Sequence, residues 1–318
     1  MIPIKLINDF YDTTAVEVEF SLFYQCNMRC DFCLQSPFKN NHAIDQLPDN
    51  WLQNAIDRFK QSIPTYNCKN LRISLYGGEL FQDRFTDDHI NKYHQFMDAI
   101  IDFCDKGNYK YSFELVTNLV YKKVDRMLDF ITKHNCSIAS SFDFVGRFHK
   151  PSQYQLWRRN IEYVLGKGIH IGIIIIGHKQ NLFALQNDKY DIGFFANSPN
   201  VNVDVAEYDD VVSNPEFKPT TEQFVQFVKL LKTKYPLINL SYYGDAVRCG
   251  LRVLDISSTH TILQRCDEVK LTEQIIRKFN CLSCPYKPEC IIVCPRKFLQ
   301  NNFCPNKQIY DNKQNNKD

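Results

Sequence analysis

The stretch CNMRCDFC, residues 26–33, places three cysteines within eight positions. Tetrahedral metal sites in proteins need four ligands, which structural zinc sites usually supply as two close pairs. Three closely spaced thiolates can instead hold three irons of a cubane 4Fe–4S cluster and leave the fourth iron without a protein ligand. The spacing therefore predicts an open iron–sulfur site on Cys26, Cys30 and Cys33. The alternative is a zinc site completed by a distant residue such as His42.

The length and net charge of the chain limit the functions that it can have. A chain of 318 residues is long enough for one large domain and a smaller one. The 38 Lys and Arg against 36 Asp and Glu leave a net charge of +2, so nucleic-acid binding is unsupported. The N-terminus lacks a basic segment followed by an apolar core, and the longest aliphatic run, residues 169–177, is too short to span a bilayer. We expect a cytoplasmic protein with no membrane partner.

The thirteen cysteines fall mainly into two groups, and in a cytoplasmic chain of this size they favour metal binding over disulfides. Three lie alone between the groups, in apolar or helical contexts, and are expected to be structural thiols: Cys68, Cys104 and Cys136. The second group contains seven members: Cys249, Cys266, Cys281, Cys284, Cys290, Cys294 and Cys304.

Between the two groups, short runs rich in β-branched and aromatic residues alternate with segments of helical length. The expected strands cover residues 15–23, 71–77, 111–118, 137–143, 169–177 and 201–208. The expected helices cover residues 49–63, 89–104, 122–134, 154–168 and 220–235. Alternating βα units imply a parallel sheet with right-handed crossovers, and six units suffice for an open barrel. We therefore predict an α/β fold with a partial (β/α)6 TIM-like barrel over residues 1–236, and a polar, disordered tail over residues 306–318.

These residues resemble the radical S-adenosylmethionine superfamily, whose cluster loop reads CxxxCxxC with an aromatic residue before the third cysteine. Phe32 holds that place. The turn after the second strand resembles the GGE motif of the family, with Gly77, Gly78 and Glu79, followed by Leu80 where the family often has proline. The resemblance implies that the glycines let the backbone approach the cofactor, and that Glu79 places negative charge opposite its ammonium group.

Polar residues also end the third and fourth strands. Thr117, Asn118 and Ser141, with Asp143 close behind, resemble the positions that face the cofactor and its ribose in the family. The same residue types also cap helices, and that reading stays open for each of them. In related enzymes an arginine after this segment meets the cofactor carboxylate, and the candidates here are Arg147 and Arg158.

The second cysteine group resembles the SPASM extension, which follows many radical S-adenosylmethionine barrels, and it predicts a small iron–sulfur domain over residues 237–305. A zinc ribbon would explain four of these cysteines but not seven. The resemblance implies one complete auxiliary 4Fe–4S cluster on Cys281, Cys284, Cys290 and Cys304. It implies a second, incomplete cluster on Cys249, Cys266 and Cys294, whose fourth ligand is absent or is not a cysteine.

The resemblance implies reductive cleavage of S-adenosylmethionine to a 5′-deoxyadenosyl radical, which removes hydrogen from an unactivated C–H bond. Relatives with a SPASM domain mostly oxidise peptides and proteins, so a peptide or protein side chain is the expected substrate. As in the sulfatase-maturing branch, Asp267 directly follows Cys266, which makes it a candidate catalytic base. Residues 267–279 also read as a helix, and Asp267 would be an ordinary N-cap for it.

The expected partners are a flavodoxin- or ferredoxin-type electron donor and, for a leader-bearing peptide, a separate leader-binding protein. Two alternatives remain open. A radical enzyme acting on a nucleotide or another small molecule would use the same barrel, and a noncatalytic metal-binding scaffold would use the same cysteines.

Overall fold

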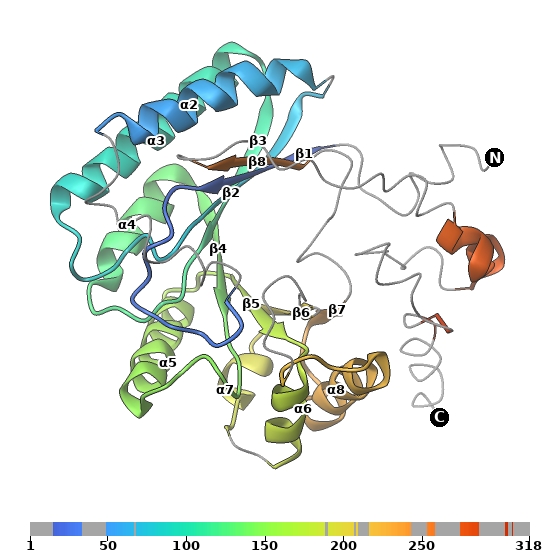
Figure 1. The fold of residues 1–318 in the computed structure, drawn as a ribbon. Coiled ribbons are helices and arrows are strands. Elements are labelled where there is room, and N and C mark those ends of the chain that lie inside the picture. Colours follow the sequence, from blue (N-terminus) through green and yellow to red (C-terminus); the bar gives the residue numbers. More distant parts are fainter. Residues whose placement is uncertain are drawn as a thin grey trace.

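The computed structural model shows a sheet wrapped by helices (Figure 1). It describes residues 15–33, 49–66, 68–187, 190–206, 208, 216–242, 253–257, 274–285, 303–304 and 307.

The sheet is parallel throughout, with the strand order β7-β6-β5-β4-β3-β2-β1-β8. Its strands are β1 (Val16–Ser21), β2 (Asn70–Tyr76), β3 (Lys110–Val116), β4 (Cys136–Ser141), β5 (Ile171–Ile176), β6 (Val201–Ala206), β7 (Leu240–Tyr242) and β8 (Val253–Ser257). Consecutive strands from β1 to β7 are neighbours, as in a barrel built from βα units.

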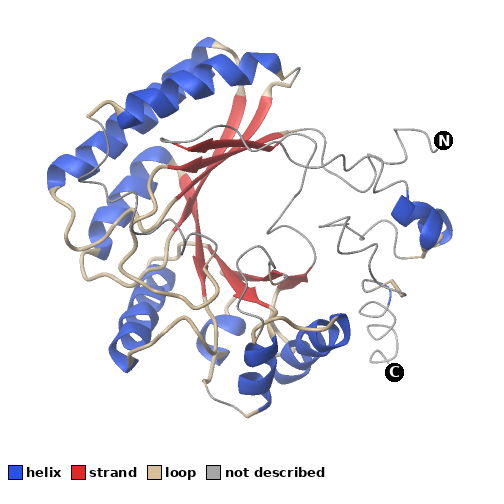
Figure 2. Cartoon of the chain, viewed as in Figure 1, coloured by secondary structure: helices blue, strands red, loops and turns tan. Residues whose placement is uncertain are grey.

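Helices cover the convex face of this curved sheet, and the concave face is free of them in the described part of the chain (Figure 2). They are α2 (Trp51–Ser62), α3 (Asp87–Lys106), α4 (Val124–His134), α5 (Pro151–Gly166), α6 (Lys179–Gln186), α7 (Gly193–Ala196) and α8 (Thr221–Lys234), with 3-10 turns η3 (Ile63–Thr65) and η4 (Cys281–Ser283). The predicted partial α/β barrel is thus confirmed.

Alternation along the strands explains which face is buried. In β1, Val16, Val18 and Phe20 are fully buried, and the Phe20 ring packs against rings of α2 and α3 at centroid distances of 5.6 and 5.0 Å. Because successive strand residues point to opposite faces, the residues between them face the concave side. Those residues are polar and half-buried, as Glu17 and Glu19 show. The concave face can therefore take a polar ligand.

Local sequence signals set the helix ends. Thr220 caps α8, because its Oγ1 accepts a hydrogen bond from the Gln223 N–H at 3.2 Å, and the Gln223 side chain accepts one from the Thr220 N–H at 2.9 Å. Asn135 ends α4 in the left-handed region with φ +51°, a conformation that asparagine tolerates well.

Six expected strands correspond to β1–β6, but the described sheet has two more. β7 pairs with β6, and β8 pairs with β1, so both edges come from residues 237–305. The predicted cysteine-rich segment therefore begins by completing the sheet. The division into domains stays a prediction, and most of the tail over residues 306–318 lies outside the described residues.

The three isolated cysteines carry thiols and no disulfide. Cys104 is fully buried in α3, and burial raises the pKa of its thiol to about 12, as it does for Cys136. Both thiols are therefore protonated at neutral pH, which agrees with the predicted structural role. No helix in the described part of the chain is both long enough and apolar enough to cross a bilayer.

Candidate active site

The segment that carries the three cysteines, residues 22–33, follows β1 and is called the cluster loop below. It contacts the loops after four other strands. Leu22 N–H donates to Tyr76 O at 3.2 Å, and Asp31 N–H donates to Gly146 O at 2.8 Å. The Asn27 amide donates to Val120 O. The Phe32 ring lies 5.0 Å from the His178 ring. The predicted cofactor residues thus gather at the carboxyl edge of β1 to β5.

The Gly-Gly turn after β2 packs directly on the cluster loop. Gly78 N–H donates to Phe23 O at 2.7 Å, and Glu79 N–H donates to Gln25 O at 2.9 Å. A Cβ atom on Gly78 would stand 1.7 Å from Gln25 O, and one on Gly77 would stand 2.5 Å from Phe23 O. The glycines are therefore required for close approach to the cluster loop, a role that the family resemblance did not indicate.

The Glu79 side chain is 1% exposed, and three protein groups donate to its carboxylate. The Phe81 N–H donates to Oε1 at 3.0 Å, the Asn118 N–H donates to Oε2 at 2.6 Å, and the Thr117 hydroxyl lies 3.0 and 3.1 Å from the two oxygens. The carboxylate joins the ends of β2 and β3. The prediction that it faces the cofactor ammonium is untested, and its described partners are all protein donors.

Burial raises the pKa of Glu79 to about 7, although its hydrogen bonds lower it. The folded chain therefore holds this proton more tightly than the unfolded chain, whose carboxyl titrates near 4.5. We expect this group's contribution to the free energy of unfolding to be largest below about pH 4.5, to fall by about 3 kcal/mol as the pH rises to about 7, and to be constant above that. Urea unfolding between pH 4 and 8 measures the change.

Glu79→Gln should remove this pH dependence. It should cost about 1–3 kcal/mol below about pH 4.5, because the amide NH2 would face a backbone N–H at either oxygen position. The difference from wild type should then shift in favour of the variant by about 3 kcal/mol as the pH rises to about 7. Glu162→Gln is the matched control, since Glu162 is half exposed and pairs with Arg158 on α5. A loss of stability between pH 4.5 and 7 that is equal in wild type and Glu79→Gln would contradict the assignment.

The two polar residues that follow β3, Thr117 and Asn118, both bond to Glu79 of the GGE turn, and Asn118 also contacts the cluster loop. Thr117 is buried, and its hydroxyl bonds the Tyr121 hydroxyl at 3.0 Å as well as Glu79. The Asn118 amide donates to Asn27 Oδ1 at 2.7 Å and lies 3.5 Å from Cys26 Sγ. Asn118 thus contacts the cluster loop directly, whereas the Thr117 hydroxyl bonds to Glu79 and Tyr121.

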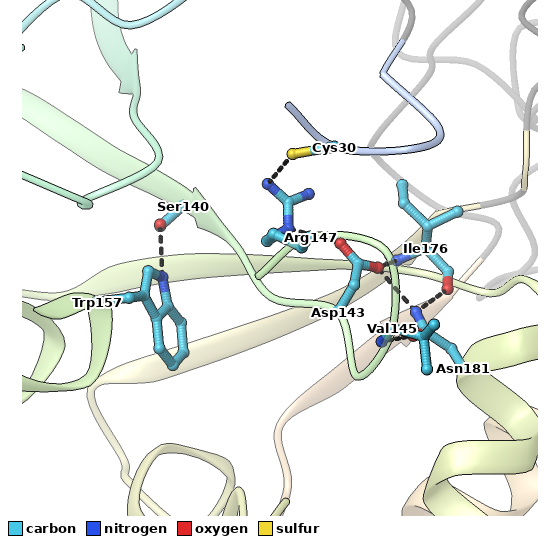
Figure 3. A network of polar contacts seen from close by, with 8 residues as sticks. All are labelled: Cys30, Ser140, Asp143, Val145, Arg147, Trp157, Ile176 and Asn181. Carbon is cyan, nitrogen blue, oxygen red and sulfur yellow. Dashed lines mark hydrogen bonds and ion pairs between the residues drawn. The ribbon is translucent and has the colours of Figure 1, made fainter. Parts of the chain in front are cut away.

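At the end of β4, two serines point to opposite faces. Ser140 is fully buried and accepts a hydrogen bond from Trp157 Nε1 of α5 at 3.3 Å (Figure 3). Ser141 is the next residue and half-buried, so it faces the concave side. A side chain on the concave face can reach a ligand bound there, so contact between Ser141 and the cofactor stays a prediction.

The two candidate arginines lie in different surroundings. Arg147 is 9% exposed, pairs with Asp143, and places Nη1 at 3.8 Å from Cys30 Sγ. Arg158 is half exposed on α5, where it pairs with Glu162 at 2.9 Å and lies over the Phe194 ring. Of these two, Arg147 is the one placed at the cluster loop.

His178 is a site residue that the sequence analysis missed. It is 1% exposed at the end of β5, beside Phe32 and Phe217. Its Nδ1 accepts from the Asn181 N–H at 3.0 Å, so the ring proton is on Nε2, which has no hydrogen-bond partner among the described residues. Burial lowers its pKa to about 3, so it is neutral at physiological pH. A histidine two residues after the apolar run 171–176 was the available signal.

The three thiols of the cluster loop form no disulfide. N–H donors lie close to the sulfurs of Cys26 and Cys30. Cys26 Sγ accepts from the Met28 N–H at 3.3 Å and from the Asn118 amide, and Cys30 Sγ lies near Arg147. In the described part of the chain no three His, Cys, Asp or Glu side chains gather closely enough to hold one metal ion. Ligands of a single zinc lie about 2.3 Å from it, and so within about 4 Å of one another.

Comparison with known proteins gives matches in structure alone. No protein-family model matches the chain, and no curated protein matches it in sequence. The structure of native anSMEcpe with bound AdoMet and Cp18Cys peptide matches with a TM-score of 0.56 at 12% identity, over 87% of this chain and 88% of that chain. Native anSMEcpe with bound AdoMet gives 0.54 at 11% identity, over 86% and 87%. The anSMEcpe protein is an anaerobic sulfatase-maturating radical S-adenosylmethionine (radical SAM) enzyme.

The chain has the radical SAM fold. The resemblance drawn from the cluster loop and the GGE turn is thus confirmed at the level of the fold. The donors around Cys26 and Cys30 suit an iron–sulfur cluster in this radical SAM fold, because thiolates bound to iron accept such hydrogen bonds. Cluster binding by Cys26, Cys30 and Cys33 stays a prediction.

The residues predicted to hold the two auxiliary clusters are described only in part. Cys281, Cys284 and Cys304 lie among the described residues, with Cys281 buried and the other two half-buried. Residues 274–278 are helical, within the predicted helix over residues 267–279. The remaining predicted residues lie outside the described part of the chain: Cys249, Cys266, Cys290, Cys294, the candidate base Asp267, and His42 of the alternative zinc site.

Proposed function

We propose that this chain is a radical SAM enzyme that cleaves S-adenosylmethionine reductively and oxidises a peptide or protein side chain. In this proposal Cys26, Cys30 and Cys33 hold a 4Fe–4S cluster whose open iron binds the cofactor. When bound, these groups supply a 5′-deoxyadenosyl radical that removes hydrogen from the substrate.

One observation carries the proposal. The loop with the three thiols leads out of the first strand of a radical SAM fold, and loops from four other strands fix it in place. Two of its three sulfurs receive N–H donors.

The chain's own residues position and shield the reacting groups. Glu79 and Thr117 hold the GGE turn and the end of β3 together, and the turn is bonded to the cluster loop at Phe23 and Gln25. The buried His178 ring packs on the buried Phe32 ring of the cluster loop and excludes water from that side of the loop. A reactive radical requires such exclusion.

A peptide substrate is favoured over a nucleotide by the structural neighbours, because anSMEcpe has been solved with bound peptides. The polar concave face agrees with a substrate rich in hydrogen-bonding groups: Tyr76 donates to Glu19 at 3.2 Å, and Arg72 lies 3.6 Å from Glu17. We further propose the two auxiliary clusters within residues 237–305, with Asp267 as the base, and a flavodoxin- or ferredoxin-type donor in the cytoplasm.

The test is anaerobic purification and cluster reconstitution of the full chain, followed by iron analysis and cofactor cleavage. We expect about twelve irons per chain, from three clusters, and 5′-deoxyadenosine formation under reducing conditions. Small peptides encoded beside the gene, co-expressed with the enzyme, should show a mass change consistent with oxidation or cross-linking. A peptide left unchanged while a nucleotide or another small molecule is consumed would replace the peptide assignment, and zinc without iron would defeat the enzyme assignment altogether.

A further inference from the structure

A cation lies beside the cluster loop. Arg147, in the loop after β4, places Nη1 at 3.8 Å from Cys30 Sγ (Figure 3). Its guanidinium lies 5.6 Å from the centroid of the Phe32 ring. Arg147 is 9% exposed, so little water separates its charge from the thiol. A charge acts over a short distance most strongly where water is excluded.

Asp143 holds this arginine in place. Its Oδ2 accepts from Arg147 Nε at 2.7 Å, and its Oδ1 accepts from the Ile176 N–H at 2.9 Å and from the Asn181 amide at 2.8 Å. The Asn181 Oδ1 in turn accepts from the Val145 N–H at 3.1 Å. The guanidinium is therefore anchored to the ends of β4 and β5 and to α6, all independent of the cluster loop.

The guanidinium keeps its charge in this buried place. A guanidinium stays protonated in proteins, and the buried Asp143 carboxylate pairs with it at 2.7 Å. Burial raises the pKa of Asp143, and Arg147 and the N–H donors limit that rise. The positive end of this ion pair is the end near Cys30.

We propose that Arg147 is a positioning residue that sets the reduction potential of the cluster on Cys26, Cys30 and Cys33 by placing a positive charge and an N–H donor at the Cys30 sulfur. The proposal rests on the proposed function, since it requires that cluster. In the reduction step the external donor loses one electron and the cluster gains it, and no bond forms or breaks. The gained charge is negative, so a nearby cation and a hydrogen bond to sulfur stabilise the reduced form and raise the potential.

The test is a potentiometric titration of the reconstituted full chain, followed by EPR. The relevant signal is the one that changes when S-adenosylmethionine is added, because the cofactor binds the open iron of this cluster only. For Arg147→Met we expect the ratio of reduced to oxidised cluster at a fixed potential to fall about tenfold, which is ~59 mV for one electron. Arg147→Lys keeps the charge and should stay close to wild type.

Two further variants serve as controls. Arg158→Met is the matched control, because Arg158 pairs with Glu162 on α5, and it should titrate as wild type. The double variant Asp143→Asn with Arg147→Met avoids an unpaired buried carboxylate, and its potential should lie below that of wild type but not below that of Arg147→Met.

Several outcomes would overturn the inference while leaving the proposed function intact. One is a wild-type potential in both uncharged variants, and another is an equal shift in Arg147→Lys and Arg147→Met. Loss of the cluster from both uncharged variants would also overturn it, because Arg147 would then be needed for assembly. A wild-type chain with no signal that responds to the cofactor would instead refute the proposed function, and the inference with it.

Discussion

Replacing Cys30 with alanine is expected to abolish formation of 5′-deoxyadenosine from S-adenosylmethionine. Cys30 is buried in the cluster loop, and its loss leaves an iron that water or small ligands must cover. The N-terminal cluster should be lost, so the iron content should fall by about four per chain while the auxiliary clusters stay. Iron analysis, EPR and chromatography of the cofactor products measure this result.

Cys68→Ala is the matched control. Cys68 is half-buried, and its Sγ lies 3.5 Å from Asn70 O at the start of β2, at the opposite end of that strand from the GGE turn. We expect full iron content and normal cofactor cleavage in this variant. Formation of 5′-deoxyadenosine at the wild-type rate in Cys30→Ala would refute the assignment of the N-terminal cluster.

Gly78→Ala is expected to destabilise the protein by about 3 kcal/mol and to displace the cluster loop. The added Cβ would stand 1.7 Å from Gln25 O and 2.1 Å from Gln25 C, which are backbone atoms, so the two loops must move apart. That movement breaks the bond from Gly78 N–H to Phe23 O. Urea unfolding of the metal-free chain measures the stability, and iron analysis after reconstitution measures the effect on the cluster.

Gly166→Ala provides the comparison with the same chemical change. Gly166 is the last residue of α5, and a Cβ there would meet nothing within 4 Å. Alanine in a helix is favoured over glycine, so this variant should be as stable as wild type or about 0.5–1 kcal/mol more stable. Equal stability of the two variants would show that the GGE turn tolerates a side chain.

The strands and most helices were predictable because their patterns are strong. Each of β1 to β6 overlaps an expected run, and β2, β3 and β4 begin one residue before it. The runs alternate or are continuously apolar, which is typical of a buried parallel sheet. β7 has only three residues, too few to show a strand pattern. β8 lies between Cys249 and Cys266, in a segment that we interpreted as metal-binding because of its cysteines. Helices α6 and α7 were also missed, because they are short.

The location of the site was predictable, but the partners of its residues were not. Parallel strands bring their carboxyl ends to one edge, so the strand-end positions of Glu79, Asn118 and Cys26 already imply that they meet. Which donor reaches which acceptor depends on packing across the sheet. The sequence could not show that Glu79 would accept from Thr117, or that Arg147 rather than Arg158 would lie at Cys30.

The pairing of β8 with β1 has a consequence for the order of folding. β1 leads into the cluster loop, and in the described part of the chain one of its edges pairs with Val253–Ser257, which leaves the ribosome after β1 to β7. Until then β1 exposes a row of unpaired N–H and C=O groups, and contacts this distant in sequence form slowly. A shortened chain used to study the three N-terminal thiols alone therefore has to extend through Ser257. One that stopped after α8 would leave β1 open to strands of other molecules.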